Sequence, residues 1–333
     1  MVRAAVDIEA VARRGLQHWD CDSDGIRSMA SIWQAELLRR LITTAISVAR
    51  TTAPGDELSA WHELLDHRNE LTWSTPEDVS LVFGGVMDPS ARIDALRRLT
   101  ARRGRMVPAS LRYLADSPAP QWAKTAMEEI AQDQRFGGRP EMIEPVVGDI
   151  SQRRAQSQYV LGLIEAVWPE LALERHLLVR EVVFLKGCTG LSSTIPGALG
   201  AVFIGQPEPD IGLYLTWIHE ISHHALHVRM AFDRLVVNGE DRAPSALRAE
   251  PRLLVGHFHQ VFVLARMCQG VQRLLPHLSG ADVSPARQRL ELLTSKFGLG
   301  INALRKHAVF TPVGGRLADD LERYHHRLVN EVK

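Results

Sequence analysis

The amino-acid sequence predicts a mainly α-helical, bundle-like fold with a small β element ahead of one histidine-rich helix. Long segments carry apolar residues at spacings of three and four without an internal proline, as amphipathic helices do. Two short segments are instead rich in Val and Phe and bounded by glycines, as strands are. The chain has 333 residues and is 45% hydrophobic, so it is long enough to bury a substantial core.

The first half of the chain is predicted to form a helical lobe over residues 1–168. Residues 25–50 carry the longest amphipathic pattern. The segment STPEDVSLVFGG, residues 74–85, has a Ser/Thr cap, a proline and two acidic residues at its start and two glycines at its end, which predicts a complete helix. Three further helices are expected on similar grounds, over residues 88–104, 117–133 and 139–168.

The composition changes after residue 168, and residues 169–333 are predicted to form a second lobe, packed with the first into one compact unit. Its two strands are expected at 176–187 and 197–205, with a polar turn between them. A helix is expected from 210 to 230 and a loop at 238–246. The remaining helices are expected over residues 251–278, 284–297 and 315–331.

Charge and cysteine content exclude several classes of protein. Lys plus Arg and Asp plus Glu number 39 each, so no overall field attracts nucleic acid or an anionic membrane. The scattered Cys21, Cys188 and Cys268 show no pairing typical of a disulfide framework or a cysteine-bound zinc. The N-terminal residues lack a signal-peptide pattern, and no apolar run is long enough to span a bilayer. We therefore expect a cytoplasmic protein.

The segment HEISHHALH, residues 219–227, contains the HExxH motif inside an apolar stretch. Residues four apart on a helix share a face, so His219 and His223 can both present ring nitrogens to one metal ion. Glu220 then lies near the same ion without binding it. Burying two histidines and a carboxylate is costly unless they have partners, and a metal ion is one such partner. His224 and His227 are expected off this face.

Two histidines do not complete a metal site. Catalytic zinc takes three protein ligands, and non-haem iron takes three on one face. The candidates for a third ligand are Glu240, Glu250, His257 and His259. Because His257 and His259 are two residues apart, they point about 200° away from each other on a helix, and only one can face the ion.

Together, HEISHHALH and the segment EPRLLVGHFHQVFVLARM at 250–267 resemble the HExxH-type modification proteins of ribosomal peptide clusters, a family of 2-oxoglutarate-dependent peptide β-hydroxylases. The resemblance extends to SMASIWQAELLRRLITTA at 28–45 and SSTIPGALGAVFIG at 192–205. It implies iron(II) held by His219, His223 and His259, since His259 follows Gly256 by three residues as the family's third ligand does. The implied co-substrate is 2-oxoglutarate, and the implied partner is a precursor peptide.

In the implied site, the distal carboxylate of 2-oxoglutarate needs a cation, and the planar fork of arginine suits it. Arg252 is the first choice and Arg248 the second. Ser193 and Thr194, with Ser192, are candidates to hydrogen-bond the co-substrate or the peptide, although such a cluster also makes an ordinary turn.

The main rival is a zinc metallopeptidase in which Glu220 is the general base and Glu250 or Glu240 the third ligand. Against it, the extended HExxHxxGxxH pattern is missing, because position 226 is Leu and position 229 is Arg. A third alternative is a metal-free scaffold or peptide-binding protein in which the histidines are structural.

Overall fold

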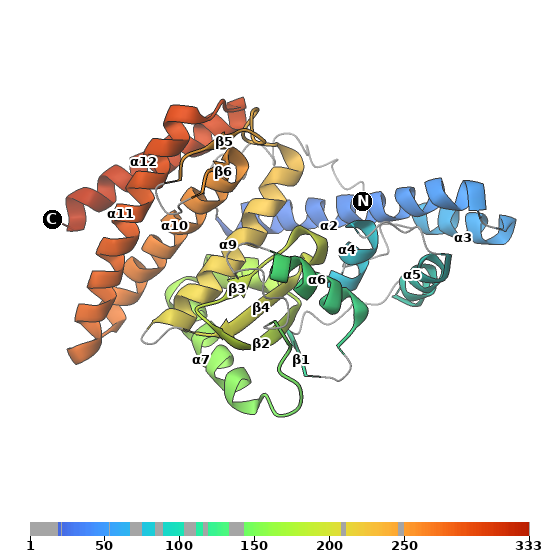
Figure 1. Ribbon diagram of the computed structural model, residues 1–333, viewed down its shortest axis with the longest axis horizontal. Helices are drawn as coiled ribbons and strands as arrows, with labels where there is room; N and C mark the ends of the chain where they lie inside the picture. Colours follow the sequence, from blue (N-terminus) through green and yellow to red (C-terminus); the bar gives the residue numbers. More distant parts are fainter. Residues whose placement is uncertain are drawn as a thin grey trace, which may run out of the picture. The chain divides into compact units, whose positions relative to one another are not determined.

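The computed structural model describes residues 19–20, 22–52, 54–66, 75–83, 89–102, 111–115, 119–132, 143–207, 211–245 and 250–332. The predicted mainly α-helical fold is confirmed, with one small sheet and a short hairpin (Figure 1). No helix in these ranges combines the length and the apolar character needed to cross a membrane.

The described residues form two compact units, each built from separate stretches of the chain. The first, called here the histidine unit, draws on Met1–Met29, Ala155–Arg175 and Pro207–Lys333. The second, called the sheet unit, draws on Ala30–Arg154 and His176–Gln206. The sequence suggested a division at residue 168, whereas residues on both sides of that position contribute to each unit.

The helices expected in the first half are present as α2 (Ser23–Thr52), α4 (Pro76–Phe83), α5 (Pro89–Arg102), α6 (Gln121–Gln132) and α7 (Ser151–Val167). Two more helices, α3 (Gly55–Asp66) and α8 (Pro169–Leu178), were not predicted. The predicted helix at 139–168 is wrong in its first part. Pro145 instead makes an isolated bridge to Leu185, the amide of Val146 donates to the Phe184 carbonyl, and Gly148 has a φ of 90°, which a helix cannot contain.

The sheet has the strand order β1-β2-β4-β3. Its strands are β1 (Arg112–Leu114), β2 (Glu181–Thr189), β3 (Ser192–Ser193) and β4 (Ala201–Gln206). β2 pairs in parallel with β1 and β4, while β3 runs antiparallel to β4. The small β element before the histidine-rich helix was predicted, but the first predicted strand began too early, because 176–178 belong to α8. β1 and β3 are too short for their sequence pattern to reveal them.

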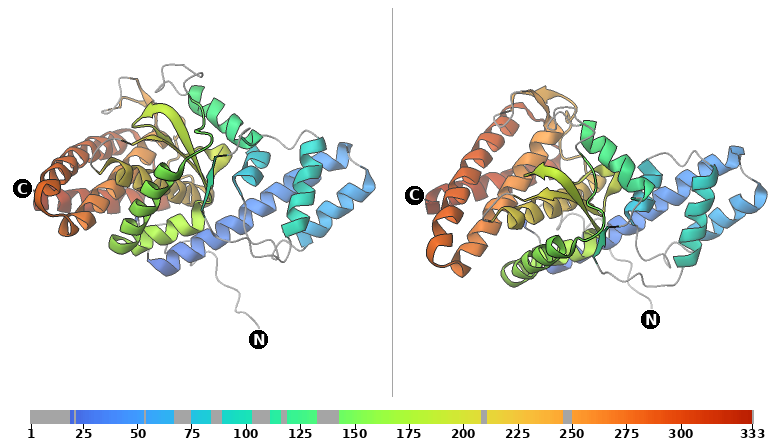
Figure 2. Two further views of the ribbon diagram at one scale, coloured as in Figure 1. Left: turned by 90° about the horizontal axis from the view of Figure 1, so that it is seen from below. Right: turned by 60° about the horizontal axis from the view of Figure 1, so that its bottom comes forward.

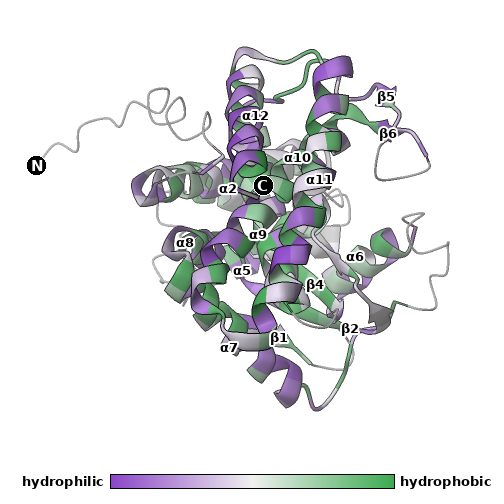
Figure 3. Cartoon of the chain, turned by 90° about the vertical axis from the view of Figure 1, so that its left-hand side faces the viewer, coloured by the Kyte–Doolittle hydropathy of each residue, from purple (hydrophilic) through white to green (hydrophobic). Residues whose placement is uncertain are grey.

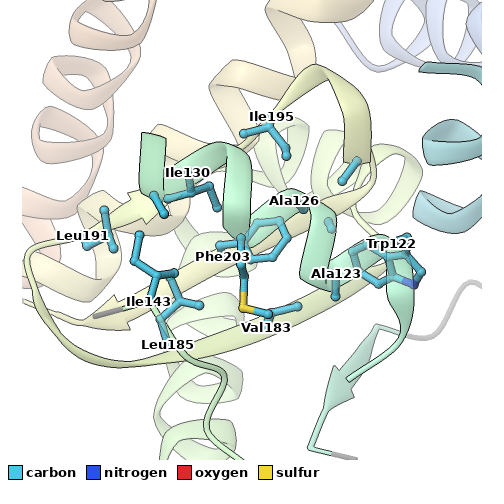
Figure 4. Packing of buried hydrophobic residues seen from close by; sticks show 14 residues of the cluster. Trp122, Ala123, Ala126, Ile130, Ile143, Val183, Leu185, Leu191, Ile195 and Phe203 are labelled. Atoms are coloured by element: carbon cyan, nitrogen blue, oxygen red, sulfur yellow. The ribbon is translucent and has the colours of Figure 1, made fainter. Parts of the chain in front are cut away.

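An apolar core joins α6 to one face of this sheet (Figure 4). Trp122, Ala126 and Ile130 lie four residues apart along α6 and meet Val183 and Phe203 from the two central strands. The rings of Trp122 and Phe203 are 6.4 Å apart in an edge-on arrangement, which is favourable for aromatic pairs. A second core in the same unit joins α2, α3 and α5.

In the histidine unit, the main helices are α9 (Gly212–Phe232), α10 (Leu254–Leu274), α11 (Val283–His307) and α12 (Pro312–Val332). Both views of Figure 2 show α10, α11 and α12 side by side. α11 runs about ten residues beyond its predicted end at 297, and the predicted loop at 238–246 contains β5 (Arg242–Ala243), which pairs with β6 (Arg252–Leu253). Hydrophilic and hydrophobic residues alternate along α12 (Figure 3), as expected of a helix with one buried face.

Candidate metal centre

Helix α9 buries its apolar side chains and carries a row of histidines on a less buried face. Trp217, Ile218, Ile221, Ala225 and Leu226 are all at most 1% exposed. The remaining face carries His219, His223 and His227 at intervals of four, and each is half-buried. A helical interval of four places these side chains one above another on a single face.

Close packing between α9 and α10 brings a fourth histidine to this face. The Tyr214 hydroxyl donates to the carbonyl of Gly270 at 3.0 Å. At Gly270 a Cβ would lie 2.2 Å from Cδ1 of Ile218, so the glycine permits the two helices to approach this closely. The contacts of Tyr214 and Ile218 with Gly270 hold the start of α9 against the later part of α10. His259 lies nearer the start of α10, where it faces His223 of α9.

Three histidines named from the sequence lie together. Nε2 of His223 is 3.0 Å from Nε2 of His219, and Nδ1 of His223 is 3.2 Å from Nδ1 of His259. The ring centroids of His223 and His259 are 5.4 Å apart at 30°. In each close nitrogen pair, one nitrogen donates and the other accepts, according to the tautomers.

The ring orientations do not yet form a complete coordination set. His259 faces the second nitrogen of His223 and not the one beside His219. Within the described ranges, no group of three His, Cys, Asp or Glu side chains converges on a point where it could hold one ion. A turn of the imidazoles about their Cβ–Cγ bonds, which is a soft torsion, is required for three of them to share an ion.

Burial keeps the imidazoles of His223 and His259 neutral at neutral pH. It lowers the pKa of His223 well below the ordinary value, and the neighbouring histidines lower it further. Burial, with a smaller contribution from the Arg252 guanidinium, lowers the pKa of His259 to about 4. A neutral imidazole has the free electron pair that a metal ion needs. The donor set therefore suits a divalent transition metal, which is commonly bound by imidazole nitrogen.

Glu220 lies beside the first histidine of the motif. Its side chain is 0% exposed, and Oε1 is 3.8 Å from Nε2 of His219. The carboxylate is therefore close to the nitrogen that would bind the ion, as the motif predicts.

The other candidates for a third ligand lie elsewhere. His257 is buried, and its Nε2 is 3.2 Å from the carbonyl oxygen of Ala243, so its ring holds the β5–β6 hairpin. Glu240 and Glu250 are exposed. Among the described contacts, none joins these three residues to the histidines of α9, whereas His259 contacts His223.

Arg252, on β6, lies close to His259. Its side chain crosses Gly256, where an added Cβ would be 2.4 Å from the arginine Nε. Nη1 is 3.4 Å from Oε1 of Gln260. The absence of a side chain at Gly256 thus leaves room for the guanidinium along the start of α10, one turn before His259.

For three of the residues named as co-substrate ligands, the described structure does not test the prediction. Arg248 lies outside the described residues. Ser193 is buried on β3, where it pairs with Phe203, and Thr194 follows it; both belong to the sheet unit. Their role in binding stays a prediction.

Sequence reasoning placed His227 off the metal-binding face, and the structure corrects this. The ring centroid of His227 is 4.9 Å from that of His259. The signal was present in the sequence, since His219, His223 and His227 repeat at intervals of four. His224 does point elsewhere, with Nδ1 2.9 Å from the carbonyl oxygen of Glu220.

Two buried arginines, Arg229 and Arg266, lie on the helices that carry the histidines. Two guanidinium groups lie near the ring of Phe262, those of Arg229 at 5.2 Å and Arg266 at 5.6 Å from its centroid. Arg266 also lies 5.4 Å from the Trp168 ring and is paired with Glu174 through both its terminal nitrogens. These contacts join α8, α9 and α10 and hold the two histidine-bearing helices together.

Comparison with known proteins does not identify a function for this group of residues. No model of a known protein family matches the chain, and no curated protein matches it significantly. The centre is therefore interpreted from its own residues: three adjacent imidazoles, one buried carboxylate and one nearby guanidinium.

Proposed function

We propose that the protein is an iron(II)- and 2-oxoglutarate-dependent hydroxylase that acts on the β-carbon of a residue in a ribosomally synthesised precursor peptide. The observation that carries this proposal is the 3.2 Å contact between ring nitrogens of His259 and His223. It makes an imidazole, and not a carboxylate, the candidate for the third ligand.

The residues of this chain have separate tasks in the proposed reaction. His219, His223 and His259 hold iron(II) and leave positions free for other ligands. Iron(II), with 2-oxoglutarate and oxygen, supplies the oxidation that replaces a C–H hydrogen of the peptide by a hydroxyl group. Arg252 orients the co-substrate by pairing with its distal carboxylate. The apolar residues around α9 limit the access of water to the site.

Release of succinate tests the activity even while the peptide is unidentified. Protein given iron(II), 2-oxoglutarate and air is expected to form succinate slowly, and addition of its precursor peptide should accelerate this and add one oxygen to the peptide by mass spectrometry. Absence of succinate formation and of any mass gain, from protein that has bound iron, contradicts the proposal.

Replacement of Arg252 by methionine is expected to raise the KM for 2-oxoglutarate by about 10- to 100-fold, because a hydrogen bond between charged groups contributes about 1.5–3 kcal/mol. Gly256→Ala should act in the same direction, since its Cβ would occupy the place of the Arg252 side chain. The matched control is Arg234→Met, which removes an exposed charge from the same unit. An unchanged KM in both Arg252→Met and Gly256→Ala would remove Arg252 from the site.

A zinc metallopeptidase is the second candidate, and the position of Glu220 favours it. A buried carboxylate 3.8 Å from a ligand nitrogen is placed to take a proton from a water molecule. On this alternative, zinc-loaded protein cleaves peptides, and Glu220→Gln abolishes cleavage while zinc stays bound. A zinc-loaded protein with no activity on a mixture of unfolded peptides argues against it.

A further inference from the structure

A polar pocket lies between the later part of α10 and the end of α12, in the histidine unit. Its volume is about 360 Å³, within the range of sites that bind small molecules. Two aromatic rings, two guanidinium groups, two carboxylates and two carboxamides line it. Gln269, its first residue on α10, lies ten residues beyond His259, which is roughly 15 Å along the helix. The pocket is therefore separate from the candidate metal centre.

The aromatic wall of the pocket is held in place by its own contacts. The ring centroids of Trp19 and Tyr324 are 4.4 Å apart, with 31° between the ring planes. The Tyr324 hydroxyl donates to Oε1 of Gln272 at 2.7 Å, and Nε2 of Gln272 donates to Oε2 of Glu331 at 2.7 Å. Trp19 and Tyr324 are both buried. The wall is thus formed before any ligand binds, as is usual for small-molecule sites.

Gln269 places an acceptor without a donor in the lining of the pocket. The residue is 8% exposed, and its Nε2 donates to Oδ2 of Asp20 at 2.7 Å. Its Oε1 is buried and accepts no hydrogen bond from the described part of the chain. Buried acceptors in folded proteins are nearly always hydrogen-bonded. A ligand with an N–H group would supply the donor, since rotation of the carboxamide about its last side-chain bond is a soft motion.

The same side of the pocket carries more negative than positive charge. Arg273 lies 3.9 Å from Oδ2 of Asp20 and 3.8 Å from Oε2 of Glu170. Both distances are longer than a hydrogen bond, and one guanidinium group is shared between two carboxylates. This side therefore favours a cationic donor over a neutral one.

Arg327 supplies a positive charge to the pocket from α12. Its guanidinium carbon lies 5.7 Å from the centroid of the Tyr324 ring. Glu331 follows one turn later, but its carboxylate accepts from Gln272, and no ion pair joins Arg327 to a carboxylate among the residues that the structure describes. The planar guanidinium fork is thus available to a carboxylate of a ligand.

We propose that this pocket binds a free α-amino acid in its zwitterionic form, with its carboxylate at Arg327 and its ammonium group beside Asp20 and Oε1 of Gln269. The ammonium group brings a positive charge and three donors, which match the unsatisfied acceptor and the negative side of the pocket. The carboxylate can accept two parallel hydrogen bonds from the guanidinium fork. The inference goes beyond the proposed hydroxylase and does not depend on it, because none of these side chains belongs to the candidate metal centre.

Calorimetric titration of the full chain with each of the standard L-amino acids tests the proposal. At least one of them is expected to bind saturably, with one molecule per chain. Its carboxamide, which lacks the carboxylate, and its N-acetyl derivative, which lacks the ammonium group, should each bind at least about tenfold more weakly. Equal or tighter binding of the N-acetyl derivative would overturn the zwitterion proposal in favour of a peptide chain end. The absence of saturable binding up to about 10 mM would overturn it altogether.

Two variants at exposed positions then locate the bound amino acid. Arg327→Met and Asp20→Asn should each weaken its binding by at least about tenfold, because each removes a charged hydrogen-bond partner. The matched control is Arg323→Met, which removes an exposed arginine one turn earlier on α12 whose partner is Asp320 and should leave the affinity unchanged. Circular dichroism verifies that the variants fold. Wild-type affinity in both Arg327→Met and Asp20→Asn would place the amino acid elsewhere and overturn the proposal.

Discussion

Replacement of His259 by alanine is expected to abolish the stabilisation of the protein by metal. A ligand that binds only the folded state at 100 times its dissociation constant raises the free energy of unfolding by about 2.7 kcal/mol. His259 comes from α10 while the other ligands come from α9, so its loss leaves the ion bound to one helix only. The other histidine proposed from the sequence on α10, His257, has its Nε2 3.2 Å from the Ala243 carbonyl oxygen instead.

This expectation is measured by thermal unfolding in a chelator and in excess zinc or anaerobic iron(II). The wild-type midpoint should rise with metal, and the His259→Ala midpoint should not. Glu250→Ala is the matched control, since it removes an exposed side chain just before β6 that was a rival candidate for the third ligand. The reverse pattern, in which Glu250→Ala alone loses the stabilisation, would transfer the third ligand to the carboxylate and favour the metallopeptidase.

Replacement of Arg266 by methionine is expected to lower the free energy of unfolding by about 3–5 kcal/mol. Arg266 is 2% exposed and its partner Glu174 is 3% exposed, so the substitution leaves a carboxylate buried without its counter-charge. The variant also loses the cation–π contacts of the guanidinium with the rings of Trp168 and Phe262, which contribute further stability. Chemical denaturation monitored by circular dichroism measures the change.

A double variant separates the cost of the buried charge from the loss of packing. Glu174→Leu together with Arg266→Met should be destabilised by less than Arg266→Met alone, since no charge is then left unpaired. The surface pair of Arg323 with Asp320, in which the arginine is 62% exposed, is the control. Arg323→Met should cost no more than about 1 kcal/mol. Equal effects of Arg266→Met and Arg323→Met would show that the buried pair does not hold α8 and α10 together.

The helices could be predicted from the sequence because their signals are local. The start of α4 follows its Pro76 and acidic residues, and the apolar period of α2 is uninterrupted. The helix predicted over residues 143–150 is wrong because the backbone of this segment forms hydrogen bonds with β2, which is distant in sequence. Likewise β3 has two residues, and it exists only because β4 is beside it.

In the candidate site, too, the residues close together in sequence could be predicted, and those that depend on contacts between distant segments could not. The HExxH spacing placed His219, His223 and Glu220 together on α9, and the choice of His259 over His257 came from family resemblance, not from spacing. What distinguishes the two histidines is physical: His257 is buried against the carbonyl of Ala243, while His259 faces α9. The position of Arg252 over Gly256 depends on the fold of the hairpin, which the sequence pattern did not reveal.

The most direct test of the central claim, that three histidines hold iron(II) together with 2-oxoglutarate, is an anaerobic absorption titration. Protein loaded with one equivalent of iron(II) is expected to develop a visible charge-transfer band when 2-oxoglutarate is added, and His259→Ala should not develop it. Iron(II) that is demonstrably bound, with no such band at saturating 2-oxoglutarate, would contradict the account.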